Sequence, residues 1–428
     1  RIAHAHRDPL AGVVHVEDQA LDGFARFQGV VLLPAAQPGG NQLTLSSSPP
    51  AGSWVSATIH LTVIRWAMVN RDVTAKNGAA LTLNAGVTCP YTSDCAGWGL
   101  FINNSLSALD REGEWYYDKA ARKVYLYTTA NPNGSTVEGS VALKTDERNW
   151  GAINLGADGG TPVHDIVIDN FDLRGWFRSG IASPTNLHPD ENSNLTIENN
   201  LIRDVDDSGI SLWTWVWGAS DGKDGWRGGS NIVIENNLLD GANHFGIHTP
   251  SRLTTIENNT LRNIGVIANL NESGMGCGKE GNEGTCTEDG AGLRIYVDQP
   301  DRSGYGFTVR YNRFENVGYN GIQTFGSAST FAYNLFDHTC ASKGDGGAIN
   351  TFGNGSLSTT DAHDIQILNN IALDTLGNTD GTHPDLRAQF GFGIYIDNQS
   401  RDIVASGNTV AGSTASGILY QNSTGTIQ

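Results

Sequence analysis

A short motif that recurs along the second half of the chain limits the possible folds more than any other feature. In each copy an apolar residue stands three positions before an asparagine, and a second element, usually Gly-Ile, follows. The copies begin at Ile197, Ile234, Ile256, Val309, Phe331 and Ile367. The shortest full repeat, from Asn237 to Asn259, is 22 residues long. That length is too short for a pair of helices and is typical of one coil of a parallel β-helix.

The recurring asparagines fit the stacking of such coils. Coils of a β-solenoid stack about 4.8 Å apart, so an asparagine at the same corner of every coil can hydrogen-bond to the next one. The expected ladder contains Asn200, Asn237, Asn259, Asn312, Asn334, Asn370 and Asn408. The 428 residues include 53 Gly but only two Met, and 17% are charged, so turn formers outnumber strong helix formers. We therefore predict an all-β parallel β-helix; a β-sandwich or propeller would need hairpin turns and longer periods.

The first 150 residues lack the motif and predict a different kind of β structure. Strand-like runs at 57–63 and 81–83 alternate with a Trp-rich patch, and residues 113–127 predict a hairpin with its turn at Asp118 to Arg122. We predict a β-rich N-terminal subdomain over 1–150, packed on the first coils, and a parallel β-helix with inserted loops over 151–428. Because the chain starts at Arg1 and residues 424–428 begin another coil, we expect a processed piece of a longer protein, truncated at its C-terminus.

Charge and cysteine content restrict the partners and the compartment. The net charge of −18 would repel nucleic acid and anionic membranes, and no apolar run approaches the roughly 18 residues of a membrane span. Cys89 and Cys95 lie six residues apart, Cys277 and Cys286 nine apart, and Cys340 is left over. Two local disulfides predict a secreted protein, extracellular or periplasmic; five reduced thiols in the cytosol are the alternative. We expect a monomer that binds neither nucleic acid nor a membrane.

Insertions near the Gly-Ile strands indicate which face carries the function. The coils that span 210–237, 259–293, 334–349 and 370–394 are longer than the minimal coil, and the extra residues are expected to wall a groove. If each Ile points inward, the residue after it points outward. That outward column holds His248, Arg294, Gln323, Asn350 and Tyr395, side chains that can hydrogen-bond to sugar hydroxyls.

Aromatic and basic side chains beside the column complete the expected substrate-binding set. Trp213 and Tyr296 lie two positions further along their strands, and Trp215 and Trp217 alternate with Trp213, which predicts three rings on the groove side. Aromatic rings stack on the apolar faces of sugars; a packed lid between coil and insertion is the alternative. His244 and Lys343 stand near the same strands and are assigned to substrate binding as well.

Carboxylates in two Asp-Gly stretches supply candidate catalytic groups. Asp289 and Asp345 hold equivalent positions in coils two apart, which predicts a separation of about 9.6 Å. The two carboxyl groups lie about 6.5–9.5 Å apart in inverting glycosidases and about 5–5.5 Å apart in retaining ones. The spacing favours an Asp345–Asp289 hydrolase pair, with Asp397 and Glu288 as alternative partners. A plain turn is the other interpretation of each Asp-Gly.

A polysaccharide lyase is the competing class of enzyme. Removal of a proton next to a uronate carboxylate needs a base and a cation. The available side chains for these parts are Lys343, Arg294, His248, His244 and Tyr395, and acidic residues of the 259–293 insertion would suit calcium. The acidity of the chain argues against a uronate substrate. No metal-ligand spacing is specific, so we predict no metal site and no required cofactor, with calcium as the one ion that the chain would suit.

Four segments together resemble the right-handed parallel β-helix carbohydrate-active enzymes of the pectate-lyase-like superfamily. They are the coil motif, the hairpin Gly113-Glu-Trp-Tyr-Tyr-Asp, the run Asp345-Gly-Gly-Ala-Ile-Asn and the strand Gly393-Ile-Tyr-Ile-Asp397. The chain is most similar to glycoside hydrolases of the xylosidase and fucosidase kind. This resemblance implies a right-handed helix with Asp345, and also Asp397, in the active site. Asn350 and Asn398 depart from the family pattern, in which Tyr and a second Asp are usual.

The coil motif is shared by lyases, hydrolases, epimerases and phage tailspikes, so it does not identify the reaction. The sequence therefore predicts a secreted glycoside hydrolase that degrades a polysaccharide or oligosaccharide with a pair of carboxylates. A polysaccharide lyase is the alternative. A non-catalytic adhesive solenoid is disfavoured, because the insertions and the polar column coincide on one stretch of one face.

Overall fold

The computed structural model describes residues 4–7, 13–17, 29–30, 40–92, 94–110, 112–118, 120–134, 136–138, 151–176, 178–266, 285–286, 290–297, 303–353 and 362–428. The chain divides into two compact units. The first consists of Arg1–Val141, Asn269–Glu288 and Thr379–Ala388, and the second of Ala142–Ala268, Asp289–Asn378 and Gln389–Gln428. Two segments from the second half of the chain therefore belong with the N-terminal residues.

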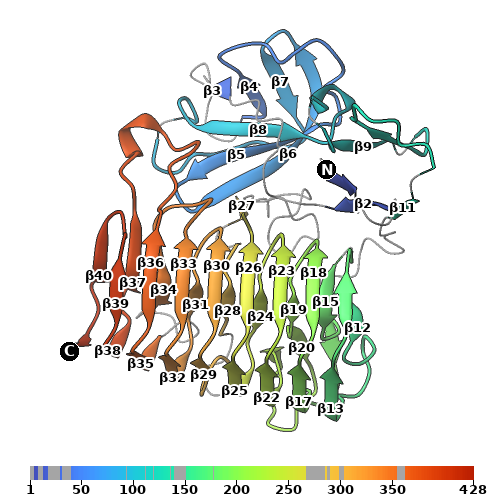
Figure 1. Cartoon of the computed structure of the whole chain (residues 1–428). Helices are drawn as coiled ribbons and strands as arrows, with labels where there is room; N and C mark the ends of the chain where they lie inside the picture. Colours follow the sequence, from blue (N-terminus) through green and yellow to red (C-terminus); the bar gives the residue numbers. More distant parts are fainter. Residues whose placement is uncertain are drawn as a thin grey trace. The chain divides into compact units, whose positions relative to one another are not determined.

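Three long parallel sheets build the second unit, and Figure 1 shows their strands side by side from coil to coil. The groove sheet contains β12 (Gly151–Asn154), β15 (Ser179–Ala182), β19 (Ile210–Ser211), β24 (Ile247–Thr249), β28 (Leu293–Ile295), β31 (Ile322–Thr324), β34 (Gly346–Phe352), β37 (Gly391–Asp397) and β40 (Ser416–Tyr420). The second sheet contains β13 (His164–Asp169), β17 (Ser193–Glu198), β22 (Ser230–Glu235), β25 (Arg252–Glu257), β29 (Thr308–Arg310), β32 (Ser327–Ala332), β35 (His363–Leu368), β38 (Arg401–Ser406) and β41 (Gly425–Ile427). The third sheet contains β14 (Asp172–Arg174), β18 (Leu201–Val205), β23 (Leu238–Ala242), β26 (Thr260–Ile264), β30 (Arg313–Val317), β33 (Leu335–Thr339), β36 (Ile371–Thr375) and β39 (Thr409–Ala411).

Successive strands of each sheet come from successive coils, and these pairs are parallel. The register places Ile234 opposite Ile256 in the second sheet and Ile247 opposite Leu293 in the groove sheet. The apolar residues of the motif point inward and form one buried core along the unit, because alternate side chains of a strand face opposite sides. The second unit is thus the parallel β-helix that the repeat predicts.

The predicted asparagine ladder is present in the turn between the second and third sheets. From Asn200 to Asn408, the side-chain amide of each asparagine donates to Oδ1 of the next one at 2.9–3.0 Å. The same Oδ1 accepts the backbone N–H of the preceding ladder residue, as Asn334 does from Asn312 at 3.0 Å. Backbone carbonyls accept the rest; Asn312 donates to the Ile256 oxygen at 2.9 Å. A buried amide satisfied in this way avoids the desolvation cost of an unpaired polar group.

The described part of the first unit is largely antiparallel. Its main sheet has the order β3-β8-β5-β6-β7-β4, with β3 (Gly29–Val30), β4 (Gln42–Thr44), β5 (Thr58–Ile64), β6 (Ala67–Asn77), β7 (Ala80–Leu83) and β8 (Gly99–Asn103). The predicted hairpin is confirmed, because β9 (Trp115–Asp118) pairs antiparallel with β10 (Lys123–Leu126) and Asp118 stands opposite Lys123. The remaining elements are β1 (His4–Arg7), β2 (Val13–Glu17), β11 (Thr136–Glu138) and the short 3-10 helix η1 (Leu106–Ala108).

Parts of two predicted groove-wall insertions are built into this first unit. Strand β27 (Thr285–Cys286) pairs antiparallel with β6. In the other segment, which contains η3 (Pro384–Leu386), the Gly381 oxygen accepts the Gly99 N–H at 2.7 Å and the Leu386 oxygen accepts Arg65 Nε at 3.0 Å. The sequence treats both segments only as walls of a groove, and the structure corrects this by making them a strand and a turn of another unit.

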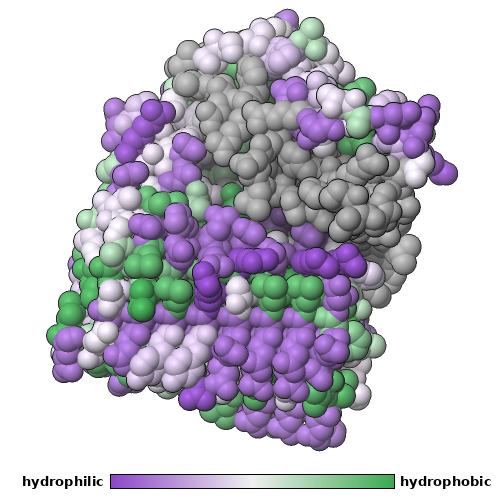
Figure 2. Space-filling view, viewed as in Figure 1, coloured by the Kyte–Doolittle hydropathy of each residue, from purple (hydrophilic) through white to green (hydrophobic). Residues whose placement is uncertain are grey.

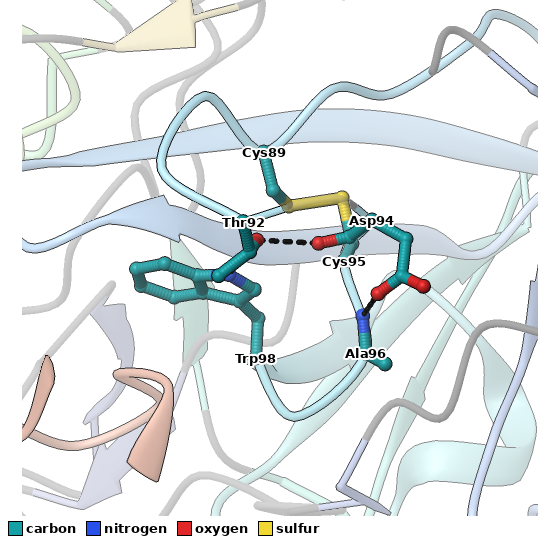
Figure 3. The surroundings of a disulfide bond; sticks show 6 residues. All are labelled: Cys89, Thr92, Asp94, Cys95, Ala96 and Trp98. Atoms are coloured by element: carbon teal, nitrogen blue, oxygen red, sulfur yellow. Dashed lines mark hydrogen bonds between the residues drawn. A yellow bond between two sulfur atoms is a disulfide. The ribbon is translucent and has the colours of Figure 1, made fainter. Parts of the chain in front are cut away.

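One of the two predicted disulfides lies within the described residues. Cys89 and Cys95 are bonded (Figure 3), and the nearby Trp98 indole donates to the Thr92 hydroxyl at 3.0 Å. Cys277 lies outside the described residues and only the backbone of Cys286 is described, so that disulfide stays a prediction. Cys340 is a free, buried thiol. Within the described ranges, no helix is both long and apolar enough to cross a membrane.

Candidate active site

The outward column predicted from the sequence is present on the groove sheet in the predicted register. The pairs His248–Arg294, Arg294–Gln323, Gln323–Asn350 and Asn350–Tyr395 lie directly opposite one another on neighbouring strands. Apart from the half-buried Arg294, these side chains are almost fully buried, with His248 only 2% exposed. Two of their polar atoms, His248 Nε2 and Gln323 Oε1, have no hydrogen-bond partner among the described residues. Burial of such atoms without a partner costs about 1–3 kcal/mol each, which is expected where a ligand supplies the partner.

Asp345, Tyr395 and Asp397 come together at one end of this column. Asp345 directly precedes β34, and its backbone N–H donates to the Phe390 oxygen at 2.7 Å. Tyr395 and Asp397 project from the same side of β37 because they are two residues apart. The Tyr395 hydroxyl lies 3.3 Å from Asp345 Oδ1 and interacts also with Asp397. Its partner on the next coil is Gln421, whose Oε1 is 2.7 Å away.

The surroundings of Asp397 raise its pKa. Burial, together with the Asp345 carboxylate, raises the pKa of Asp397 from its ordinary value of 3.8 to about 6. Asp397 Oδ1 is buried and has no hydrogen-bond partner within the described ranges. Burial and the same two carboxylates raise the pKa of the Tyr395 phenol, so Tyr395 stays protonated and acts as a donor. The group therefore contains a carboxyl that keeps its proton in mildly acidic solution beside a second carboxyl and a fixed hydroxyl.

The Gly346-Gly347 pair allows Asp345 to approach Tyr395. A Cβ on Gly347 would lie 3.2 Å from the Tyr395 Cβ, and one on Gly346 would lie 2.7 Å from Asn320 Oδ1. Only glycine, which has no Cβ, leaves room for Tyr395 and Asn320 at these positions. Asn320 Oδ1 instead accepts the Gly347 N–H at 2.7 Å, and the Tyr319 hydroxyl donates to the Asp345 backbone oxygen at 2.9 Å.

Asn320, Tyr319 and Gln421 are site residues that the sequence did not single out. Asn320 is fully buried, and its Nδ2 has no partner among the described residues. It precedes the inward Ile322 by two positions, and this place lies between the Asp-Gly position four residues before the inward apolar residue and the outward column after it. Gln421 follows the last groove strand, and no sequence signal indicates it.

His244 pairs with a buried aspartate and lies near two basic side chains. His244 Nδ1 is 2.8 Å from Asp207 Oδ1, with both side chains buried, and burial lowers the pKa of His244 despite that partner. The neutral ring must donate from Nδ1 to the carboxylate, which leaves Nε2 with its lone pair. Arg294 and Lys343 lie close enough to His244 to lower its pKa further. Burial and Arg294 hold the pKa of His248 well below its usual value, so His248 is neutral too.

The aromatic residues form a packed row rather than an open wall. Trp213 lies with its ring centroid 4.6 Å from those of His248 and Tyr296, and Tyr296 continues the row to Phe325 at 6.3 Å. Trp213 is only 9% exposed and Phe325 only 4%. The guanidinium of Arg294 packs between these rings, 5.6 Å from Tyr296 and 5.5 Å from Phe325. The row fixes the orientation of His248 and Arg294 and offers little ring face for stacking.

Two of the three tryptophans predicted on the groove side, Trp215 and Trp217, contact residues that lie outside the groove sheet. Trp215 lies in a separate small sheet of β16 (Asn186–Leu187), β20 (Thr214–Val216) and β21 (Gly225–Arg227). Its ring contacts Trp226 at 5.3 Å, and Trp217 stacks on His188 at 3.9 Å. The insertion after β19 leaves the groove sheet and forms its own hairpin, so period-two counting from Trp213 no longer applies.

Two predicted catalytic residues, Asp289 and Glu288, lie outside the described residues. The Asp345–Asp289 pair therefore stays a prediction, and Asp345 with Asp397 is the carboxyl pair that the structure describes. One group in the described part of the chain has metal-ligand atoms within 4.8 Å of one another, namely Asp337, His338 and Asp374. These residues stand on the third sheet, away from the groove sheet, and His338 is already hydrogen-bonded to Asp337 at 2.6 Å.

No protein family's sequence profile matches the chain, and no curated protein matches it. Solved structures match at low similarity. The catalytic domain of Agl-KA is 10% identical over 94% of this chain and 91% of that chain, with a TM-score of 0.34. The catalytic unit of a GH87 α-1,3-glucanase from Streptomyces thermodiastaticus strain HF3-3 is 14% identical over 93% and 89%, with a TM-score of 0.33. An alginate lyase from Paenibacillus sp. strain FPU-7 is 13% identical over 62% and 88%, with a TM-score of 0.31. Similarity at this level does not transfer an activity, so the reaction must be inferred from the site itself.

Proposed function

We propose that the protein is a glycoside hydrolase in which Asp397 is the general acid and Asp345 is the base or nucleophile. The observation that supports this assignment is the pair of carboxyl groups around the Tyr395 hydroxyl, one of them with its pKa raised to about 6. Glycoside hydrolysis needs a carboxylic acid to protonate the leaving oxygen and a carboxylate on the other side of the bond. A carboxyl group with a raised pKa beside a second carboxylate can supply both at one pH. Asp289 is the alternative partner of Asp345.

The rest of the column would bind the sugar. His248 Nε2, Gln323 Oε1 and Asn320 Nδ2 are buried atoms without partners in the described part of the chain, and sugar hydroxyls both donate and accept hydrogen bonds. A substrate that satisfies these atoms recovers the energy that their burial costs. His248 and Gln323 lie two strands apart on the groove sheet, on β24 and β31, so the bound oligosaccharide would follow the axis of the solenoid toward Asp345 and Asp397.

The setting of the enzyme follows from its charge and its disulfide. The Cys89–Cys95 bond supports a secreted or periplasmic location, and the net charge of −18 favours a neutral polysaccharide or oligosaccharide over nucleic acid or an anionic membrane. The proposed reaction uses two carboxyl groups and needs no cofactor. Calcium, where bound, would belong to the acidic 259–293 insertion. We propose a monomer.

A lyase is the second candidate, and the His244–Asp207 pair is the observation that favours it. The neutral His244 oriented by Asp207 has the form of a general base. Arg294 and Lys343 lie near it and would neutralise a uronate carboxylate. In that reaction the base takes the proton next to the carboxylate, and the glycosidic oxygen leaves with its electron pair. The acidic overall charge weighs against an anionic polymer.

One assay separates the two reactions. The protein is incubated with arabinoxylan, an α-glucan, a fucan and alginate, and both reducing ends and the ultraviolet absorbance of unsaturated uronate are followed. A hydrolase releases reducing ends without the absorbance, whereas a lyase produces both together. Reducing ends from a neutral polymer that disappear in Asp345→Asn would support the proposal. Absorbance growth on alginate that Asp345→Asn leaves intact and His244→Gln abolishes would replace it with the lyase.

A further inference from the structure

Two tyrosines interrupt an otherwise uniform position in the turn between the second and third sheets. The residue before each ladder asparagine, or its equivalent in the first coil, has a left-handed backbone with φ between 54° and 67°. In six coils this residue is Asn170, Asn199, Asn236, Asn258, Asn369 or Gly407, and in two it is Tyr311 or Tyr333. Asparagine and glycine adopt this conformation readily, but a bulky side chain pays roughly 1–2 kcal/mol for it.

The tyrosines also give up hydrogen bonds that the asparagines make. Asn258 donates to Asn236 Oδ1 at 2.5 Å, and Asn199 donates to Asp169 Oδ1 at 2.8 Å. A phenol ring cannot replace these contacts along the turn. Because the fold itself prefers asparagine at this position, two adjacent tyrosines need a reason other than stability.

The two rings form a rigid, exposed pair. Tyr311 and Tyr333 are stacked with their centroids 5.3 Å apart and an angle of 16° between the rings, and they are 56% and 52% exposed. The residue that follows each of them, Asn312 or Asn334, is a ladder asparagine that is only 1% exposed, so the backbone beneath the rings is fixed. Arg310 lies 5.8 Å from the centre of the Tyr311 ring and is ion-paired with Glu257.

The size of the patch selects the class of ligand. An aromatic side chain offers 150–250 Å² in all, so two half-exposed rings present about 200 Å², whereas a stable protein interface buries about 1,200 Å² or more. Figure 2 shows a largely hydrophilic face crossed by an interrupted row of hydrophobic residues. The outward positions that begin the strands of the third sheet form such a row, and Thr260 and Arg313 interrupt it. The apolar surface therefore fits one or two sugar rings better than a second protein.

We propose that Tyr311 and Tyr333 form a secondary carbohydrate-binding site that holds a neutral polysaccharide on the solenoid, away from the catalytic groove. The tyrosines lie in the turn between the second and third sheets, so the site is separate from the groove sheet. The ring surface contacts the C–H faces of a sugar, and the tyrosine hydroxyls with the Arg310–Glu257 pair hydrogen-bond to its hydroxyls. The charges of Arg310 and Glu257 cancel, which favours a neutral sugar over an anionic one. This inference rests on the proposal that the protein acts on polysaccharides.

The test uses the substitution that the other coils already contain. Tyr311→Asn and Tyr333→Asn are combined in an Asp345→Asn background, so that the polymer stays intact. Mobility is compared in native gels that contain arabinoxylan, dextran, laminarin or alginate. We expect at least one neutral polymer to retard the Asp345→Asn protein, and the added pair of substitutions to weaken that binding about fivefold or more, the loss of about 1 kcal/mol of stacking. Tyr117→Asn, at another exposed tyrosine, should leave retardation unchanged.

A rise in the Tm of the double variant would confirm that it folds and that the tyrosines are not kept for stability. With the catalytic residues restored, its turnover of a short aryl glycoside should equal that of the wild type. Equal retardation with and without the two tyrosines, or no retardation in any gel, would overturn the site. So would a dimer, measured by light scattering, that the substitutions dissolve. Retardation without hydrolysis of any polymer would instead refute the proposed function and leave the binding site standing.

Discussion

Two columns of buried polar side chains run along the same coils, and their hydrogen-bond states differ. In the asparagine ladder each amide is satisfied by the next coil, as between Asn312 and Asn334. On the groove sheet, His248 Nε2 and Gln323 Oε1 are equally buried and have no partner in the described part of the chain. A stack of buried polar side chains along the coils therefore does not by itself reveal function. The difference is whether the column satisfies itself, and only an unsatisfied column calls for a ligand.

The largest expected effect is on the reaction and leaves the ladder untouched. Asp345→Asn should lower kcat about a thousandfold or more, roughly 4 kcal/mol in the barrier, because the amide can act neither as base nor as nucleophile. Its Tm should stay equal or rise, since one of two close acidic groups is removed. Reducing-end assays on the identified polymer and a thermal melt measure the two quantities. Asn320→Ala is the matched control, which should weaken binding more than turnover. A fully active Asp345→Asn enzyme would refute the assignment of Asp345 as the base or nucleophile.

A substitution in the asparagine ladder should lower stability and leave turnover unchanged. Asn312→Ala removes the link to Asn334 and takes from the Asn259 backbone N–H its acceptor and from the Ile256 carbonyl its side-chain donor. Two or more unsatisfied buried groups should lower the free energy of unfolding by about 3 kcal/mol, with the kcat of the remaining folded protein unchanged. Urea denaturation provides the measurement. Asn408→Ala at the end of the ladder should cost less, because no further asparagine of the ladder follows it. Equal losses at both positions would show that the ladder is not cooperative.

How much of each column could be predicted follows from its geometry. The ladder and the register of His248, Arg294 and Tyr395 depend only on the repeat and on the period of two along a strand, both of which are visible in the sequence. The approach of Asp345 to Tyr395 is not visible, because the residues are 50 positions apart and come from different coils that pack closely at Gly346-Gly347. The spacing argument named Asp397 only as an alternative partner of Asp345, and the resemblance to known enzymes implied both residues.

The insertions were the least predictable part. Nothing in the 259–293 insertion shows that Thr285 would pair with Val69, more than two hundred residues earlier in the chain. Similarly, the alternation of Trp213, Trp215 and Trp217 predicted one strand, but the chain leaves the groove sheet after Trp213 and forms the β20–β21 hairpin. Local periodicity holds while a coil is regular and fails where an insertion makes contacts of its own.

The pH dependence can sharpen the comparison at Asp397. As the general acid, Asp397 must be protonated, so kcat/KM should fall as pH rises through about 6, the value to which burial and Asp345 raise its pKa. Carboxyl titration by NMR should show this pKa falling in Asp345→Asn, where the like charge is gone.

The raised folded-state pKa of Asp397 also means that the free energy of unfolding decreases as pH rises from 3.8 to about 6. Asp397→Asn should therefore be more stable at pH 7.5, by roughly 1–2 kcal/mol after allowance for solvent screening. A less stable Asp397→Asn would contradict this account.

Tyr395→Phe tests whether the hydroxyl positions the carboxyl groups. The hydroxyl contacts Asp345 and Gln421, and its hydrogen bond lowers the pKa of Asp397. Its removal should reduce kcat about tenfold, near 1.4 kcal/mol, and shift the alkaline limb of the pH profile upward. A purely structural role would reduce kcat without moving that limb. Tyr420→Phe is the control, because its hydroxyl binds the Ile403 oxygen and not a carboxylate.

The smallest effect is expected in a third column, on the outer side of the second sheet, whose like charges repel one another. Glu198, Glu235 and Glu257 lie opposite one another on successive strands, and burial with the two flanking glutamates raises the pKa of Glu235. Its folded-state pKa exceeds the unfolded one, so stability is lost as pH rises through it. Glu235→Gln should increase the free energy of unfolding at pH 7.5 by a few tenths of a kcal/mol, since exposed charges are screened, and the gain should shrink in acid and in high salt. Glu257→Gln should do the reverse because Glu257 pairs with Arg310. If both variants lose stability, the glutamates do not repel one another, and contacts between neighbouring coils stabilise this column as they stabilise the asparagine ladder.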